Sequence, residues 1–410
     1  MLVVVFTSSH VDRQIMGILG QPIKESLAIS DTQLGLLTGI MFALFYATLG
    51  MPMAMWADRH NRRNLIAFSV FTWSFMTALC GYAQNFMQLL LARIGVGVGE
   101  AGSSPPSHSM IADLYPPEQR ATAMSIFGTG INWGILIGFL VGGWINEWYG
   151  WRWAFVIVGL PGILIAAVVR FTVTEPPRGL SEATKSKVPP PPFATVVRTV
   201  AGNPILRNII IASTLVAFAG YASVIWMPIY LVRIHDMGTG ATGTYLALLI
   251  GIGGALGIYC GGRAADWLGK RYGPAWPAWL IAIVTVISIP LLFLAFHAET
   301  GSAALWAYAI PAALGTVYVG TGFAIVQNQA PLEMRSTVAA INLFIQNIIG
   351  LGIGPFSVGF FSDAFSPEYG ADGLRYAMTL TLLMLVWSTW HYFRTGVLLR
   401  RQALEADARG

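Results

Sequence analysis

The chain has 410 residues, of which 55% are hydrophobic and only 10% are charged. Because so few charged residues cannot cover the surface of a water-soluble globular protein, the composition excludes that class of protein and indicates an integral membrane protein. The net charge of +5 does not indicate nucleic-acid binding, because the basic residues lie in short gaps between apolar runs.

The apolar runs are of the helical kind, since a helix needs about 20 residues to cross a bilayer. They predict twelve spanning helices, at residues 1–22, 33–55, 64–83, 86–112, 121–147, 152–173, 206–232, 241–265, 275–296, 303–329, 336–361 and 374–398. The first run is interpreted as a helix rather than a signal peptide, because no basic leader or small-residue cleavage site accompanies it.

One long polar connector, which contains the proline run Pro189 to Pro192, splits the chain near its middle. The prediction is therefore an all-α membrane protein with two six-helix bundles. They comprise residues 1–173 and 206–398, joined by a cytoplasmic linker at 174–205 and followed by a cytoplasmic tail at 399–410.

Lysine and arginine residues predict the orientation, because cytoplasmic loops carry an excess of them. If both termini and the even-to-odd gaps share one side, the opposite side holds only Lys24, Arg152, Arg233 and Arg375. We therefore expect a multi-pass protein of the cell membrane, in a bacterium the inner membrane, with both termini in the cytoplasm. Arg13 and Arg93 are left over inside predicted spans.

Two stretches of the first half recur in the second half. The segment Ala54-Met-Trp-Ala-Asp58-Arg59-His-Asn-Arg62-Arg63 matches Gly262-Arg-Ala-Ala-Asp266-Trp-Leu-Gly-Lys270-Arg271. The segment Pro116-Pro-Glu-Gln-Arg120-Ala-Thr122 matches Pro331-Leu-Glu-Met-Arg335-Ser-Thr337. Two matches in the same order predict two facing half-molecules around a central cavity, the architecture of alternating-access transporters.

Ionisable residues inside the first and fourth predicted helices form the candidate functional site. Arg93 and Glu100 lie seven positions apart, on one helix face, and Asp12 and Arg13 lie in the first helix. Such groups are costly at membrane depth and mark ion or substrate pathways. Glu100 or Asp12 can exchange a proton, because burial favours the neutral carboxyl group and a nearby arginine favours the charged one. The alternative is a permanent ion pair with Arg93 or Arg13 that only ties the two helices together.

The same arginines can instead bind an anionic headgroup, because a guanidinium group matches phosphate. In one version, protonation of Glu100 frees Arg93 for that role. His10, one turn before Arg13, and His108 are more simply hydrogen-bonded helix contacts than proton carriers.

Other polar and small residues in the spans predict helix contacts and a mixed cavity. Glycines at 130, 134, 138 and 142 predict a groove for close helix packing, and Pro105 and Pro106 predict a break in the fourth helix. Amides are seldom left unpaired in hydrocarbon, whereas aromatic residues mostly pack. The residues expected near substrate in the second half are Tyr221, Trp226, Asn342, Gln346 and Asn347.

The repeated Asp-Arg-x-x-Arg-Arg loop resembles the signature of the major facilitator superfamily, and the chain looks most like its spinster-like branch. The similar segments are Val11-Asp-Arg-Gln14, Leu91-Ala-Arg-Ile-Gly-Val-Gly-Val-Gly-Glu-Ala101, Ile111-Ala-Asp-Leu-Tyr-Pro-Pro-Glu-Gln-Arg120, Gly150-Trp-Arg-Trp-Ala-Phe155 and Asn347-Ile-Ile-Gly-Leu-Gly-Ile-Gly-Pro355. Ala54 and Asn61 stand where glycines are usual in the loop. The resemblance implies a secondary transporter of lysophospholipids or sphingolipids such as sphingosine 1-phosphate, often proton-linked.

The resemblance also implies that ion pairs between the halves close the cytoplasmic side. The gate residues are then Asp58, Arg59, Arg62, Arg63, Arg120, Asp266, Lys270, Arg271 and Arg335. The alternative is that these residues only set topology and cap a helix.

The expected partners are membrane lipids and an amphipathic lipid or small-molecule substrate, and the expected state is a monomer. No metal or organic cofactor is expected, and the proton is the coupling ion. Cys80 and Cys260 lie in apolar spans and suggest no disulfide. A proton-coupled carrier of organic anions or drugs is the main rival. A membrane enzyme using Glu100 or His108 lacks a plausible nucleophile, and ATP-driven pumping lacks a phosphate-binding loop.

Overall fold

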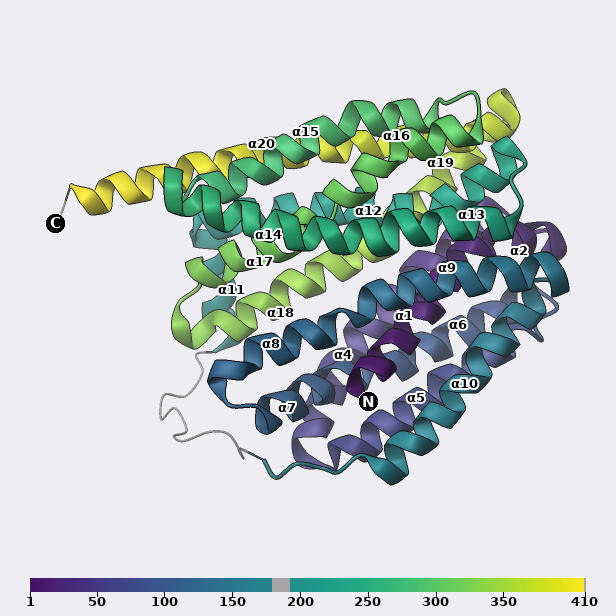
Figure 1. Cartoon of the computed structure of the whole chain (residues 1–410), viewed down its shortest axis with the longest axis horizontal. Helices are drawn as coiled ribbons and strands as arrows, with labels where there is room; N and C mark the ends of the chain where they lie inside the picture. The colour runs from purple at the N-terminus through teal and green to yellow at the C-terminus, as the bar shows by residue number, and fades with distance from the viewer. Residues whose placement is uncertain (179–191, 409–410) are drawn as a thin grey trace.

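The computed structural model describes residues 1–178 and 192–408, and the regular structure in these residues is helical throughout (Figure 1). Most of the proline run in the predicted linker lies outside the described residues. The linker nevertheless ends in a short helix, α11 (Phe193–Gly202), that packs against α12 and α18 in the second half. The C-terminal part of the predicted linker is therefore helical rather than irregular.

The N-terminal half consists of six membrane passes, several of which are built from two consecutive helices. Their bounds are α1 Leu2–Ile18, α2 Gly20–Leu27, α3 Asp31–Gly35, α4 Met41–Arg59, α5 Arg62–Cys80, α6 Phe86–Ala101, α7 Ser104–Leu114, α8 Pro117–Gly128, α9 Gly130–Tyr149 and α10 Trp151–Thr172. A π-helical turn, η1 (Leu36–Ile40), joins α3 to α4.

The C-terminal half repeats this plan after α12 (Pro204–His235). Its further elements are α13 Thr239–Leu246, η2 Ala247–Ile252, α14 Gly253–Tyr272, α15 Trp276–Phe296, α16 Gly301–Leu314, α17 Val317–Gln329, η3 Leu332–Met334, α18 Arg335–Ile345, η4 Gln346–Ile353, α19 Gly354–Tyr369, η5 Gly370–Asp372 and α20 Gly373–Asp407. Helix α20 therefore runs well past residue 398, so most of the predicted tail is helical and projects from the body (Figure 1).

Eight continuous helical stretches are long and apolar enough to cross a membrane, and the last of them, Leu332–Asp407, contains two passes. The remaining three passes are α1, α5 and the pair α6–α7. Each is too short or too polar to count as one continuous apolar span. Helix α1 has only 17 residues, α5 begins with Arg62 and Arg63, and α6 ends at Ala101 before α7 begins. The described helices therefore make the twelve passes that the sequence predicts.

The break in the fourth pass falls at Gly102 and Ser103, just before Pro105 and Pro106. The two prolines occupy the first turn of α7, where their missing N–H groups are not needed for the hydrogen-bond ladder. The prolines therefore start a new helix rather than interrupt one.

The glycine groove predicted in the fifth pass is confirmed, and it receives α1. A Cβ atom at Gly130 would meet the backbone of Thr7, one at Gly134 would meet His10, and one at Gly138 would meet Gln14 and Val11. Because these glycines have no side chain, the backbones of α1 and α9 can approach each other closely.

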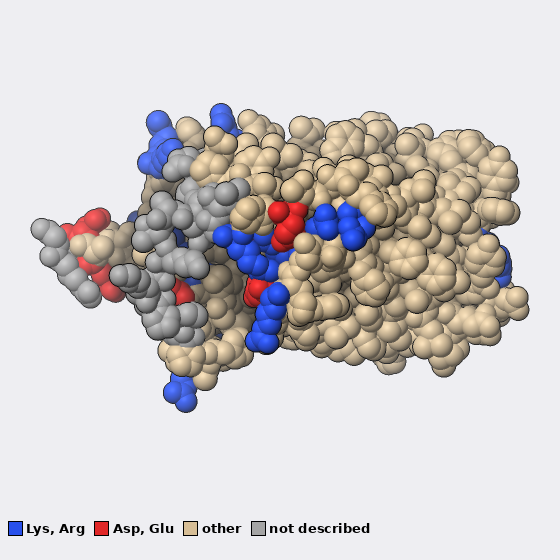
Figure 2. All heavy atoms as spheres, turned by 90° about the horizontal axis from the view of Figure 1, so that it is seen from below, with Lys and Arg blue, Asp and Glu red and all other residues tan. Residues whose placement is uncertain are grey.

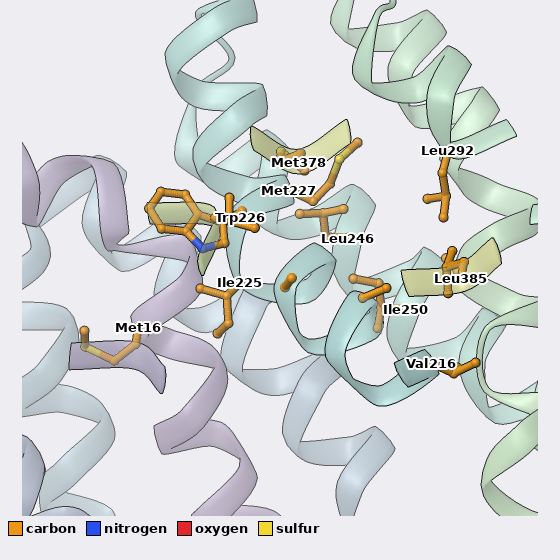
Figure 3. Packing of buried hydrophobic residues seen from close by; sticks show 14 of the residues in the cluster. Met16, Val216, Ile225, Trp226, Met227, Leu246, Ile250, Leu292, Met378 and Leu385 are labelled. Atoms are coloured by element: carbon orange, nitrogen blue, oxygen red, sulfur yellow. The ribbon is translucent and has the colours of Figure 1, made fainter. Parts of the chain in front are cut away.

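The two halves meet through α1 against α12, α3 and η1 against α19 and η4, and α9 against α13 and η2. Figure 3 shows Met16 on α1 beside Ile225 and Trp226 on α12, within one buried apolar cluster. Gly39 on η1 packs directly on the carbonyl group of Gly352 on η4. The π-helical turns therefore lie where helices of opposite halves cross.

Charged residues gather at the two ends of the molecule. Figure 2 shows a broad uncharged band between the basic residues near the linker and the few at the opposite end. Large apolar side chains within the helices are exposed, among them Leu164, Phe171 and Trp306 at 70%, 81% and 80%. A band of this kind fits a bilayer better than water. We call the end with Asp58 and the linker the linker end, and the end with Asp31 the far end.

Candidate functional site

An ion pair between α1 and α6 forms the centre of the site. Glu100 Oε2 accepts hydrogen bonds from Arg13 Nε at 2.7 Å and from Arg13 Nη2 at 2.6 Å. The Glu100 side chain is fully buried, whereas 15% of the Arg13 side chain is exposed. The acid is therefore shielded from solvent, and only a small part of its arginine partner is accessible.

Two aromatic rings of α4 surround the arginines. The Arg13 guanidinium carbon lies 4.5 Å from the centre of the Tyr46 ring and 4.9 Å from that of Phe42. The guanidinium carbon of Arg93 lies 5.4 Å from the same Phe42 ring. These distances allow cation–π attraction to both cations.

Asp12 and Arg93 complete the cluster of two acids and two bases. Arg93 donates a long hydrogen bond of 3.4 Å to the main-chain carbonyl oxygen of Asp12. The carboxylate of Asp12 is buried and forms no ion pair within hydrogen-bonding distance among the described residues; its nearest polar neighbours are the Thr77 hydroxyl group and the charged groups of Glu100 and Arg93. A buried carboxylate in this setting is expensive in its charged form.

The structure separates two alternatives for Glu100. It binds Arg13 of the first pass and not Arg93 of its own helix, so the version in which its protonation frees Arg93 has no hydrogen bond to break here. The sequence left both arginines open as partners. In the structure the Arg93 side chain turns toward Phe42 and α1 instead.

The two histidines make local contacts. His10 Nδ1 lies 2.9 Å from the carbonyl oxygen of Phe6, one turn earlier in α1, and its ring packs against Phe6. His108 packs edge-on against Phe127. Both fit the simpler interpretation of a helix contact.

A cavity of about 360 Å³ lies next to this cluster, mainly in the C-terminal half. Its walls come mainly from α12, α15, α16, α17 and α18, with Gln346 of η4 and single residues of η2, α14 and α20, and Ile131, Asn132 and Ile135 of α9 close one side. Three polar side chains bind one another in its wall: Gln346 donates to Asn342 at 3.0 Å, and Ser213 donates to the same Asn342 oxygen at 3.3 Å. The rest of the lining is largely apolar, as expected for a site that accepts a hydrocarbon group.

Tyr221 connects the cavity to the charged cluster. It lines the cavity, packs against the apolar cluster around Phe42 and interacts electrostatically with Arg13 and Tyr46. Of the second-half residues predicted near substrate, the structure brings Tyr221, Asn342 and Gln346 to the cavity. Trp226 lies outside its lining, fully buried with its indole N–H donating to the Pro355 carbonyl at 2.8 Å, and Asn347 is also outside the lining.

The predicted gate residues lie at the linker end of both halves. Asp58, Arg59, Asp266, Lys270 and Arg271 are exposed, and no ion pair among the described residues joins them across the halves. Arg63 bonds to its neighbour Asn64, and the guanidinium groups of Arg120 and Arg335 donate to carbonyls of Ala112 and Ala330 in their own halves. Their role as a gate in another conformation stays a prediction.

Arg62 differs from the other gate residues because it is buried. It pairs with Asp113 at the end of α7 and, at 2.8 Å, with Glu175 after α10. It also donates to Ser109 and to the carbonyl oxygen of Pro176. These contacts tie three segments of the N-terminal half together.

A set of charges at the far end, which the sequence did not identify as functional, joins the halves. Asp31 at the start of α3 is fully buried and receives two hydrogen bonds of 2.7 Å from Arg233 on α12. Lys24 at 2.5 Å and the hydroxyl group of Ser362 at 2.6 Å bind the same carboxylate. Asp363 on α19 accepts the main-chain N–H groups of Asp31 and Thr32. We call Asp31, Lys24, Arg233, Ser362 and Asp363 the far-end lock.

A second set of contacts at the far end links α9 to α13. Glu147 accepts the Gly240 N–H at 2.6 Å, and Trp144 donates to Thr244 at 3.0 Å. Polar contacts between the halves thus concentrate at one end, where α2 and the start of α13 lie (Figure 1). One feature of the sequence could have identified this set. Few basic residues are predicted on this side of the membrane, so Lys24 and Arg233 there are expected to have an acidic partner.

Comparison with known proteins defines the class. The family model described as Major Facilitator Superfamily matches residues 1–395, so the chain belongs to this family of transporters. It is 32% identical over 385 residues to an MFS-type efflux pump of Mycolicibacterium smegmatis, covering 92% of this chain and 87% of that protein.

Within the family, the chain is a spinster-like member. It is 28% identical to Protein spinster homolog 1 of Mus musculus, covering 87% of this chain and 70% of that protein. The structure matches that of a bacterial homologue of the human lysosomal transporter Spinster in an inward-facing, unoccupied conformation. That match has a TM-score of 0.88, 32% identity and coverage of 98% and 96% of the two chains. The prediction of a spinster-like transporter is confirmed.

Proposed function

We propose that this transporter couples proton movement to the transport of a lysophospholipid or sphingolipid-like amphiphile. The single observation that carries the proposal is the position of the Arg13–Glu100 pair beside a largely apolar cavity, with Tyr221 between them. An amphiphile needs both environments: a cation for its anionic headgroup and an apolar wall for its chain.

Charge balance provides the coupling. With all four groups ionised, Arg13 and Arg93 balance Asp12 and Glu100, so a phosphate headgroup would add uncompensated negative charge to a buried site. A proton on Glu100 neutralises its carboxylate, so that Arg13 can pair with the phosphate and the net charge of the site is restored. Asp12 can take a second proton. Headgroup binding and protonation therefore favour each other.

The basic residues predict that the linker end is cytoplasmic, and the contacts between the halves close the far end. We propose an inward-facing state for this structure, with both termini in the cytoplasm and the chain in the cell membrane. In the opposite state the far-end lock opens and the gate residues at the linker end pair.

The test is uptake of a labelled lysophospholipid into proteoliposomes with and without an imposed pH gradient. The expected result is saturable uptake that the gradient accelerates, with chemically unaltered lipid recovered. Uptake that ignores the gradient would overturn the coupling, and no uptake or binding of any lysolipid would overturn the substrate class.

A proton-coupled carrier of drugs or small organic anions is the second candidate, favoured by the similarity to a mycobacterial efflux pump. Competition separates the two. If lysolipids displace a bound drug in a headgroup-dependent manner, the lipid proposal stands; if phosphate-bearing and phosphate-free analogues compete equally, the drug carrier is favoured.

A further inference from the structure

A groove of about 470 Å³ lies between α15 and α20 on the outer surface of the C-terminal half, away from the transport site. These two helices run side by side along the top of the view in Figure 1. The groove is lined by four residues of each helix, including Val286 on α15 and Val386, Thr389 and Trp390 on α20. The hydroxyl group of Thr389 donates to the Leu385 carbonyl oxygen at 2.9 Å, and the lining is mainly hydrocarbon.

An arginine stands at one end of this apolar groove. Val386, Trp390 and Arg394 follow at four-residue spacing, which puts them on one face of α20. The guanidinium carbon of Arg394 lies 5.4 Å from the centre of the Trp390 ring. Arg394 is exposed and forms no ion pair with a described residue. Its charge is therefore available to a ligand in the groove.

Ring contacts place this end of the groove at the level of the membrane headgroups. Phe393 stacks on Trp279, which contacts Trp276, which in turn contacts Tyr272 beside Arg271. Tryptophan and tyrosine gather in this way at the interface between hydrocarbon and water. The indole N–H of Trp279 donates to the carbonyl oxygen of Phe393, and Gly396 packs on the same indole, which fixes the two helices here.

The charge around the groove has one predominant sign. Helix α15 contains no acidic residue, and the first acids on α20 beyond Arg394 are Glu405 and Asp407, about three turns further along. On α14, Lys270 and Arg271 outnumber Asp266. A zwitterionic headgroup gains little from such surroundings, whereas an anionic headgroup gains from each nearby cation.

We propose that the groove between α15 and α20 is a binding site for an anionic diacyl phospholipid of the surrounding bilayer, with an acyl chain along Val286 and Val386 and the phosphate at Arg394. The lipid belongs to the leaflet at the linker end. It is a resident lipid rather than cargo, because the groove opens away from the cavity next to the Arg13–Glu100 pair.

Native mass spectrometry of the purified full-length protein tests the site, with phosphatidylglycerol and phosphatidylcholine of identical acyl chains as probes. We expect at least one phosphatidylglycerol to bind about five-fold more tightly than phosphatidylcholine, the effect of a single cation near an anionic headgroup. Arg394→Gln should remove this preference. Arg170→Gln is the matched control, because Arg170 is also an exposed arginine stacked on an aromatic residue, Phe171, but lies in the other half.

Filling the groove provides the second arm. Val286→Trp should weaken binding of both lipids, whereas Leu383→Trp, at an exposed position outside the groove lining, should not. Equal affinity of the unaltered protein for the two lipids would overturn the proposal. So would an Arg394→Gln variant that keeps the preference while Arg170→Gln loses it, or binding that Val286→Trp leaves unchanged.

Discussion

The far-end lock makes a quantitative prediction about conformation. Asp31 is fully buried and receives both nitrogen atoms of the Arg233 fork at 2.7 Å, so Asp31→Asn removes the negative charge from a bidentate pair that joins the halves. Loss of one partner from a buried pair costs about 3–5 kcal/mol. Arg233 and Lys24 keep 11% and 27% of their side chains exposed, which lowers the cost to about 2–3 kcal/mol. Because the lock exists only while the far end is closed, the ratio of far-end-open to far-end-closed molecules should rise about 30- to 150-fold.

Electron–electron double resonance in liposomes measures this shift. Spin labels at Tyr82→Cys and Glu368→Cys, exposed positions at the far ends of the two halves, are placed in a Cys260→Ser background. Asp31→Asn should add a population at longer distance. Asp372→Asn is the matched control, because its ion pair with Arg375 lies within one half at the same end. Identical distance distributions for Asp31→Asn and the unaltered protein would refute the reasoning.

Three further predictions concern the site, the scaffold and the helix contacts. Glu100→Gln should abolish acceleration of uptake by a pH gradient while sparing lysolipid binding, as measured by uptake and by equilibrium binding; retained acceleration would count against Glu100 as the coupling acid. Arg62→Gln should destabilise the protein by about 2–4 kcal/mol, seen as a lower unfolding midpoint in detergent, because it removes the buried cation that both Asp113 and Glu175 bind. Arg63→Gln, which loses only a contact to its neighbour, should leave that midpoint nearly unchanged, and equal effects would contradict the assignment. Gly243→Ala should slow transport at least tenfold, because its Cβ would collide with a carbonyl oxygen of α9, whereas Gly262→Ala meets no atom within 4 Å and should transport normally; a fully active Gly243→Ala would show that this contact is not tight.

Local patterns predicted much of the fold from the sequence. Apolar length identified the passes, and the two repeated loops after Asp58 and Asp266 revealed the halves. The glycine spacing on the fifth pass predicted its contact with α1, because a missing Cβ is a local property that packing then uses. The sequence did not predict that α20 continues past residue 398, because the charged residues there were interpreted as a cytoplasmic tail. Arg, Gln, Ala, Leu and Glu nevertheless favour helix in water.

The candidate site was only partly predictable, since its pairings depend on which helices meet. Arg13 and Glu100 are 87 positions apart in the sequence, and nothing local distinguishes Arg13 from Arg93 as the partner. The pairing of Asp31 with Arg233 was equally unpredictable. These residues are 202 positions apart and lie at helix ends, where the sequence suggests only charged loop residues. Tertiary packing also decided that Trp226 lies in the core, while Ser213 joins the amide cluster in the cavity wall.

Substrate-driven proton movement tests the central claim most directly. Proteoliposomes that enclose a pH-sensitive dye, with no imposed gradient, receive a lysophospholipid from outside. The account predicts a change of internal pH that saturates with lipid concentration and disappears in Glu100→Gln. Lipid transport without any change of pH, or an unchanged signal in Glu100→Gln, would contradict the role of the Arg13–Glu100 pair in coupling.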